Sequence, residues 1–196
     1  MKIIQIIVLI FAISGCQSNP LLSNYPGKKT SADVTLAPSD YENEMQKGAA
    51  AYKTENFPLA LSYFKPLSHA GLGDAQAMLG YMYLHGQGVR QNTFEASLWL
   101  EKAANQGIAE ASTMLGHAYL DGDKGFKQSD QDGAYWFLRA ALLGQPQAQF
   151  QLGHLYSRGI GVERNMQEAF KWYHKSATAG YAPAQHNVAV YLMDGK

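Results

Sequence analysis

Apolar residues recur at helical spacing through most of the chain. Ala75, Leu79 and Tyr83 stand at positions i, i+4 and i+8, which places them on one face of a helix. The pattern returns at a nearly constant distance, because the alanines that open its copies are 36, 37 and 36 residues apart: Ala75, Ala111, Ala148 and Ala184. A period in this range is typical of stacked helical repeats.

A second helix is predicted in each copy from its start and end signals. Residues that commonly cap a helix N-terminus lie seven positions before each tryptophan: Asn92, Ser129 and Asn165, ahead of Trp99, Trp136 and Trp172. Glu95 and Glu168 stand three residues beyond two of these caps, which predicts capping boxes. Each second helix is expected to end at a glycine in the left-handed conformation: Gly107, Gly144 and Gly180.

A unit of two short helices is too small to bury its own apolar face, so the copies are expected to stack into one continuous core. Each first helix contains a glycine, Gly80, Gly116 or Gly153, which costs about 1 kcal/mol relative to alanine. We therefore expect a neighbouring helix to approach closely at these glycines. The loop residues Val89, Phe126 and Val162 are expected to reach into the core.

The repeated motif resembles that of the Sel-1-like repeats, which are relatives of the tetratricopeptide repeats. The clearest copy reads Ala75-x-x-x-Leu79-Gly80-x-x-Tyr83-x-x-Gly86-x-Gly88-Val89 and then Trp99-Leu100-x-Lys102-Ala103-Ala104-x-x-Gly107. The match covers roughly residues 75 to 195 and departs from the pattern at Gly133 and at Val188-Ala189. The resemblance implies an all-α fold, a right-handed α-solenoid of stacked antiparallel helix pairs that holds another protein or peptide.

The chain is predicted to divide into a leader, a tether and a row of helical units. A degenerate copy with the short turn Thr54-Glu55-Asn56 precedes the repeats and is closer to a tetratricopeptide unit. The fourth copy has only its first helix, so this end is either a capping helix or a truncated reading frame. The predicted boundaries are 1–15 for a signal peptide, 16–40 for a disordered tether, 41–74 for the N-terminal unit, 75–110, 111–147 and 148–183 for three repeats, and 184–196 for a partial fourth repeat.

The N-terminus has the pattern of an export signal. Lys2 is followed by an apolar run from Ile3 to Ile13, which is too short to span a bilayer as a helix. The sequence Ile13-Ser14-Gly15-Cys16 resembles the lipobox of bacterial lipoproteins, which implies lipid attachment at Cys16. Gln17 after it resembles the outer-membrane sorting pattern, so we expect a lipid-anchored envelope protein, on the periplasmic side of the outer membrane. The alternative is a plain signal peptide with a coincidental cysteine.

Composition and charge remove several classes of function. The formal net charge is zero, so the chain lacks the basic surface that nucleic-acid binding requires. Cys16 is the only cysteine, which excludes an internal disulfide and a cysteine-based zinc site. No motif of a hydrolase, a metalloprotease or a nucleotide-binding enzyme is present, and the Gly-x-Gly-Val loop joins two helices. We therefore predict a protein that is not an enzyme, with no catalytic residue, cofactor or metal.

Helical angles predict which side chains of the first helices face away from the core. The face opposite Ala75 and Leu79 mixes aromatic, apolar and imidazole groups, as a peptide-binding surface does. The candidate partner-binding residues on this face are Tyr81, His85, Thr113, His117, Phe150, His154 and Arg158. The alternative is that some of them pack against the tether or the C-terminal helix. For the two histidines that follow a Leu-Gly pair, His117 and His154, a metal site, hydrogen bonding in the groove and no special role all stay open.

These observations favour an adaptor or scaffold that binds a protein or peptide partner in a concave groove. A different hypothesis is an envelope enzyme or binder acting on cell-wall material, because some cysteine-rich proteins with these repeats are described as binding β-lactams. Those proteins rely on paired cysteines, which are missing here. A third hypothesis is a secreted or surface factor that engages a host protein through the same groove.

Overall fold

The computed structural model describes residues 38–193 of the chain. The predicted signal peptide, the predicted lipidation site at Cys16 and nearly all of the predicted tether lie outside the described residues. Every regular element within residues 38–193 is an α-helix, which confirms the all-α prediction. None of the helices in this segment is both long enough and apolar enough to cross a bilayer.

Short connections join the helices into consecutive pairs. In chain order the helices are α2 (Pro38–Lys53), α3 (Phe57–His69), α4 (Gly73–His85), α5 (Thr93–Asn105), α6 (Ala109–Asp121), α7 (Asp130–Leu142), α8 (Pro146–Arg158), α9 (Met166–Thr178) and α10 (Ala182–Met193). The first helices of the repeats are α4, α6, α8 and α10, and the second helices are α5, α7 and α9.

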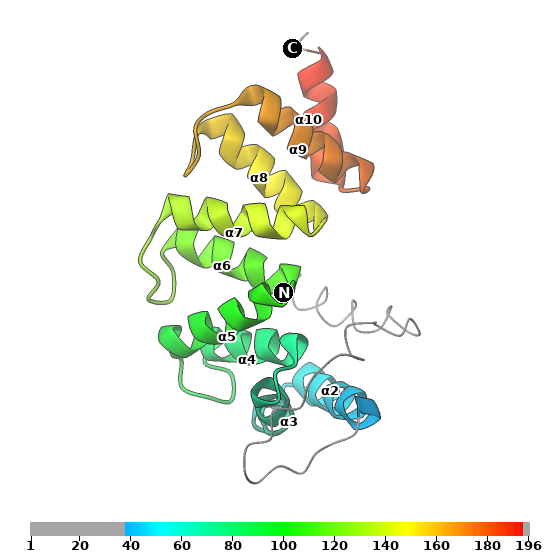
Figure 1. The fold of residues 1–196 in the computed structure, drawn as a ribbon, viewed down its shortest axis with the longest axis vertical. Helices are drawn as coiled ribbons and strands as arrows, with labels where there is room; N and C mark the ends of the chain where they lie inside the picture. The colour runs from blue at the N-terminus through cyan, green and yellow to red at the C-terminus, as the bar shows by residue number, and fades with distance from the viewer. Residues whose placement is uncertain (1–37, 194–196) are drawn as a thin grey trace.

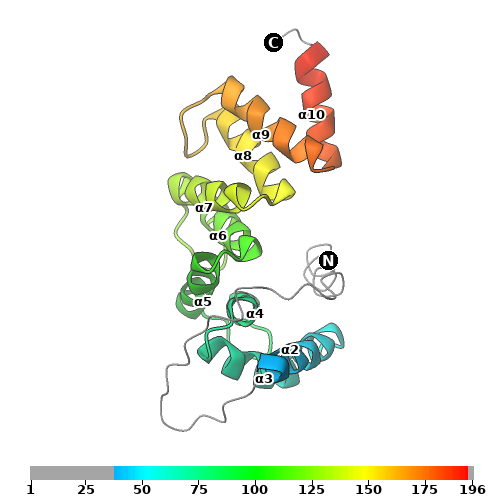
Figure 2. The same cartoon turned by 45° about the vertical axis from the view of Figure 1, so that its right-hand side comes forward.

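The helix pairs stack in chain order along the long axis of the molecule, with α2 and α3 at one end and α10 at the other (Figures 1 and 2). Each helix packs against the helices that precede and follow it in the sequence. The result is the α-solenoid that the repeated pattern predicts. Its turn between α2 and α3 is short, as expected for the N-terminal unit.

The core runs through the stack as successive clusters of buried side chains. The three tryptophans are buried, and so are Leu79, Leu115 and Leu152 from the first helices. One cluster joins α2, α3 and α4, the next joins α4 to α7, and the third joins α7 to α9. Phe126 is buried in the second of these clusters, while Val89 and Val162 are only partly buried. No unit therefore has a separate core of its own.

The glycines of the first helices lie where the second helix of the same repeat comes close. A Cβ atom on Gly80 would lie 2.8 Å from Leu100, and one on Gly116 would lie 2.8 Å from Phe137. The neighbouring helix therefore leaves no room for a side chain there, as predicted. In the loops, Gly88 has a φ of +70°, and a Cβ on it would lie 2.8 Å from the backbone oxygen of Phe57, in the preceding unit.

The second helices begin at the predicted caps, but the predicted capping boxes are incomplete. The side chains of Asn92, Ser129 and Asn165 each accept a hydrogen bond from the backbone N–H three residues on. The return bond is absent, because the Asn92 N–H donates to the carbonyl of Tyr83 at 3.0 Å. Glu95 instead accepts a hydrogen bond from the Trp99 indole at 2.9 Å. The loop folds back onto the first helix, and this already satisfies the cap residue's N–H.

Candidate functional site

The candidate site lies on the first helices of the repeats, where residue identity changes from one copy to the next. Three of the varying positions lie on the predicted outward face: Ala77, Thr113 and Phe150 are equivalent, as are Tyr81, His117 and His154, and also His85, Asp121 and Arg158. Seven of these side chains are exposed or half-buried, and we name them the variable face: His85, Thr113, His117, Asp121, Phe150, His154 and Arg158. Their helices follow one another along the stack (Figure 1).

Tyr81 was expected to be exposed, and this expectation is wrong. Its side chain is only 8% exposed, because α2 covers this side of α4. The Tyr81 ring lies 6.3 Å from the ring of Tyr52 in α2 and stacks on His85 at 4.0 Å. Tyr52 in turn donates a hydrogen bond to Gln87 at 2.6 Å. The angle of Tyr81 on its own helix could not reveal this cover.

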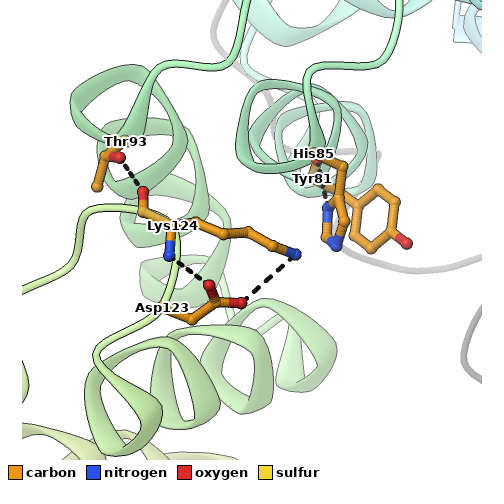
Figure 3. Close-up of polar contacts among 5 residues, drawn as sticks. All are labelled: Tyr81, His85, Thr93, Asp123 and Lys124. Atoms are coloured by element: carbon orange, nitrogen blue, oxygen red, sulfur yellow. Dashed lines mark hydrogen bonds and ion pairs between the residues drawn. The ribbon is translucent and has the colours of Figure 1, made fainter.

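His85 is exposed at the end of α4 and is held by its own helix. Its Nδ1 lies 3.0 Å from the Tyr81 carbonyl, so Nδ1 donates and Nε2 carries the lone pair of the neutral ring. Lys124 extends from the next repeat's loop toward this ring and lies 3.8 Å from Asp123 (Figure 3). Burial lowers the pKa of His85, and the Lys124 charge lowers it further. The hydroxyl of Thr93 fixes the loop by donating to the Lys124 carbonyl.

His117 and His154 occupy equivalent, half-buried positions on α6 and α8. The His117 ring meets the edge of Phe137 with a centroid distance of 4.9 Å. Burial lowers the pKa of both histidines, with Asp121 opposing the shift at His117 and Arg158 adding to it at His154. Neutral imidazoles can both donate and accept hydrogen bonds. No group of three potential metal-binding side chains occurs among residues 38–193.

Thr113 and Phe150 are tied more closely to the scaffold than predicted. The Thr113 hydroxyl is hydrogen-bonded to the side-chain oxygen of Gln145, the residue before α8. Phe150 lies between Tyr173 and Tyr181, with ring centroids 5.5 Å away in each case. Phe150 is therefore partly a packing residue, and its side chain is half-buried. Arg158 is exposed at the end of α8.

Helical angles place Asp74 and Glu110 on the outward side of the first helices, but they were applied to those helices alone and missed exposed groups on the second helices. Desolvation raises the pKa of Asp74, and neighbouring Glu110, in the equivalent position, adds to the effect. On the second helices, Phe94 is 73% exposed and Leu142 is 68% exposed. The sequence contains a signal that could have identified Phe94, because the equivalent positions of the later repeats are polar, Gln131 and Gln167. An apolar residue at a position that is otherwise polar indicates a surface feature.

Comparison with known proteins identifies the repeat. A family model described as Sel1 repeat matches residues 73–108, 109–145 and 146–181, which together make up more than half of the chain. These units begin two residues before the predicted starts at 75, 111 and 148. Among curated proteins, none matches this chain.

Solved structures support the same assignment. A Sel1 repeat protein from Oxalobacter formigenes is 36% identical, with a TM-score of 0.61 over 66% of this chain and 96% of that one. The protein c5321, a protective antigen of uropathogenic Escherichia coli with an SLR fold, is 26% identical with a TM-score of 0.73. That match covers 79% of this chain but only 34% of c5321. A Sel1 repeat protein from Klebsiella pneumoniae, 19% identical with a TM-score of 0.51 over 76% of each chain, shares the fold.

Proposed function

This chain belongs to the Sel1-repeat family, and from that premise we propose that it is an envelope scaffold that holds a protein or peptide partner against its variable face. Proteins of this family are generally scaffolds for protein-protein interaction. What we propose beyond this general role is that the protein acts as an adaptor and that it binds its partner through the variable face.

The observation that carries the proposal is the contrast between constant and changing positions. The constant positions, such as Leu79, Leu115 and Leu152, are buried and build the stack. The changing positions of the variable face are exposed or half-buried, so packing restricts their identity less than it does in the core, where changing positions such as Met82, Ala118 and Leu155 all stay apolar. Residues that the fold leaves free are available for recognition.

The chemistry of the variable face suits a polypeptide. Burial lowers the pKa of His117 and His154 below the ordinary value of 6.5, so both rings are mostly neutral at pH 7 and offer hydrogen bonds to backbone groups. Asp121 and Arg158 supply opposite charges at the ends of neighbouring first helices, and Phe150 supplies an apolar edge. The mixture favours a partner with backbone and side-chain groups of several kinds over a uniformly charged one.

Binding is tested by capture of partners from envelope extract with a matched pair of variants. The first carries His85→Ala, His117→Ala, His154→Ala and Arg158→Ala on the variable face. The control carries Phe94→Ala, Tyr135→Ala and Leu142→Ala, which are exposed on the second helices. We expect the first variant to lose a partner that the wild type and the control retain. Equal capture by all three proteins would contradict the proposal.

Membrane anchoring is the second part of the proposal and rests on the lipobox-like sequence that ends at Cys16. Several acyl chains would anchor the protein stably, whereas one gives only marginal binding. Cys16→Ser is expected to move the protein from the membrane fraction to the soluble fraction. Mass spectrometry of the mature N-terminus checks the same point, and an unmodified N-terminus would contradict it.

A second candidate is a surface factor that engages a host protein. It is favoured by one observation, the likeness to c5321, which is described as a protective antigen. Antibodies against this protein, applied to intact cells, distinguish the two placements. Binding to intact cells supports surface display, and binding only after the outer membrane is opened supports the periplasmic side.

A further inference from the structure

In the first repeat, one side-chain amide bridges two acceptors. Gln76 of α4 donates to the Ser68 carbonyl at 3.1 Å, and this bond orients its amide group. The Gln106 amide, just after α5, donates to Gln76 Oε1 at 2.7 Å and to the Gly71 carbonyl at 3.0 Å. A single donor group therefore serves both α4 and the turn before it.

The third repeat has the same acceptors without that donor. The equivalent residues, 73 positions further along the chain, are Ala141 for Ser68, Gly144 for Gly71, Gln149 for Gln76 and Ala179 for Gln106. Gln149 donates to the Ala141 carbonyl at 3.2 Å, so its amide is held in the same way as that of Gln76. Gly144 is left-handed, with a φ of +86°, as Gly71 is with a φ of +96°. We call the Gly144 carbonyl oxygen and Gln149 Oε1 the acceptor pair.

One member of the acceptor pair is buried and unsatisfied. Gln149 is only 8% exposed, and its Oε1 has no hydrogen-bond partner among residues 38–193. In the first repeat the same atom of Gln76 is bonded to Gln106. A buried acceptor without a donor costs free energy, so a donor that reaches Gln149 Oε1 is bound favourably.

A donor can approach the acceptor pair beside Ala179. In the second repeat Leu143 stands at the position of Gln106, and a Cβ on Gly107 would lie 3.9 Å from it. A Cβ on Gly144 would have no atom within 4 Å among the described residues other than its chain neighbours. Gly144 and Ala179 are both exposed. The side chain of another molecule can therefore enter at the place that Gln106 occupies in the first repeat.

The acceptor pair favours a neutral amide over a cation. Residues 140–149, which carry the pair, and residues 172–183, which pack beside it, include no Asp or Glu. An ammonium or guanidinium group would therefore lose its hydration here without gaining a carboxylate from these segments. A primary amide is uncharged and has two N–H donors, one for each acceptor, as the Gln106 amide shows in the first repeat.

The acceptor pair lies next to the variable face. Gln145, which follows Gly144, is hydrogen-bonded through its side chain to Thr113 of that face. We propose that the acceptor pair binds the side-chain amide of an asparagine or glutamine residue in the polypeptide partner. This inference rests on the proposed function, and it adds a specific requirement for the partner's sequence.

Substitutions at position 179 test whether the acceptor pair takes an amide at all. Ala179→Gln gives the third repeat the donor that Gln106 gives the first, and Ala179→Met adds a side chain of similar length without a donor. We expect the unfolding equilibrium constant of Ala179→Gln to be roughly fivefold smaller than that of Ala179→Met, measured by urea unfolding. The difference is expected to disappear in a Gln149→Met background. Equal stability of the two position-179 variants would overturn this inference and leave the proposed function untouched.

Peptide selection tests the partner's requirement. The purified full-length protein in a mild detergent selects binders from a random dodecapeptide library displayed on phage. We expect the binders to share an asparagine or glutamine whose replacement by leucine or methionine weakens binding about tenfold. Ala179→Gln should weaken the same peptides by a similar factor, because its own amide occupies the acceptor pair, and the peptide replacement should then cause no further loss. Thr178→Gln, which places the same side chain at the next exposed residue, is the matched control and should bind as the wild type does.

The outcomes separate this inference from the proposed function. Peptides that His117→Ala weakens, but that need no asparagine or glutamine, would overturn the inference and support the variable face. Peptides that Ala179→Gln and Thr178→Gln weaken equally would also overturn it. A library that yields no binder to the wild type would contradict both proposals.

Discussion

Two junctions between successive helical units, which we call joints, use different residues for the hydrogen bonds that connect one unit to the next. At the first joint, between α3, α4 and α5, the Ser68 carbonyl accepts a hydrogen bond from Gln76 at 3.1 Å. Gln106 then bridges Gln76, at 2.7 Å, and the Gly71 carbonyl, at 3.0 Å. The side-chain donors of these hydrogen bonds at the first joint are therefore neutral amides.

At the second joint, between α5, α6 and α7, the residue equivalent to Gln76 is Ser112. Its hydroxyl is buried and has no hydrogen-bond partner among residues 38–193, and the carbonyl equivalent to that of Ser68 belongs to Ala104. Arg139 of α7 donates to this carbonyl at 3.1 Å and to the Asn105 side chain at 2.8 Å. The Arg139 guanidinium also lies 5.1 Å from the centre of the Trp136 ring.

The difference shows which feature of a joint is required. The last carbonyls of a second helix accept a backbone hydrogen bond from the following turn, as Ser68 does from Gly71 and Ala104 from Gly107, and each joint adds a side-chain donor to them. The donor's identity and its helix of origin are free to change. The first joint shares its donors among several residues, whereas the second joint depends on one arginine placed on one tryptophan. We therefore expect the second joint to be the more sensitive to single substitutions.

Tryptophan removal is expected to give the largest effect. Trp136→Ala should destabilise the protein by about 3–5 kcal/mol, because it empties a large buried site. Trp99→Ala, at the first joint, should cost about 1 kcal/mol less, since Gln76 and Gln106 do not rest on that ring. Urea unfolding followed by circular dichroism measures both. Equal losses of stability in the two variants would contradict the proposed dependence of Arg139 on Trp136.

Substitution of loop glycines is expected to give the next largest loss of stability. Here the loop of the first repeat should be more sensitive than the loop of the second. Gly88→Ala places a Cβ 2.8 Å from backbone atoms of Phe57, in a left-handed conformation, and should cost about 3 kcal/mol. Gly125→Ala meets the side chain of Thr93, which can move, and should cost about 1–2 kcal/mol. Thermal unfolding of the two variants ranks them. A larger loss for Gly125→Ala would mean that loop packing is not limited by backbone contact.

A double-mutant cycle at the second joint measures the donor exchange itself. Arg139→Ala should cost about 1 kcal/mol, because it removes the side-chain hydrogen bonds to the Ala104 carbonyl and to Asn105, while the Gly107 N–H still donates to that carbonyl at 3.1 Å. Adding Ser112→Gln restores the residue type found at the first joint and at the junction of α7, α8 and α9, where Gln149 donates to the Ala141 carbonyl at 3.2 Å. We expect the second change to recover part of the loss only when Arg139 is absent. Additive effects would contradict the exchange. Lys102→Ala, which removes only an exposed cation-π contact, is the control and should cost about 0.5 kcal/mol.

The smallest predicted effect is a dependence of stability on pH. Burial lowers the folded-state pKa of His117 below its ordinary value of 6.5, so the unfolded chain takes up a proton first as pH falls. The contribution of this site is complete above about pH 6.5 and declines below it. Urea midpoints at pH 7.5 and 5.5 should differ for the wild type and differ less for His117→Tyr, which carries the first repeat's residue. The raised pKa of Asp74 acts at lower pH and is common to both proteins. An equal difference in the two proteins would mean that His117 titrates as it does in water.

The sequence predicted the framework of the fold because framework residues repeat. The caps at Asn92 and Asn165 and the close approach at Gly80 follow from local sequence patterns, and these patterns recur in each repeat. Contacts between units that are not copies of one another could not be predicted in this way. Tyr81 is buried because α2, which lies outside the repeat pattern, covers it. Likewise, no spacing rule indicates that Arg139 replaces the missing glutamine at position 112.

Partner contact along the variable face is the central claim, and site-specific photocross-linking tests it most directly. A photoreactive amino acid is placed at Asp121 or His154 on the variable face, and at Phe94 or Tyr135 on the second helices, in the otherwise unchanged protein in living cells. We predict that both variable-face positions yield adducts with the same protein partner and that neither second-helix position does. Adducts from Phe94 or Tyr135 with none from Asp121 or His154 would contradict the account.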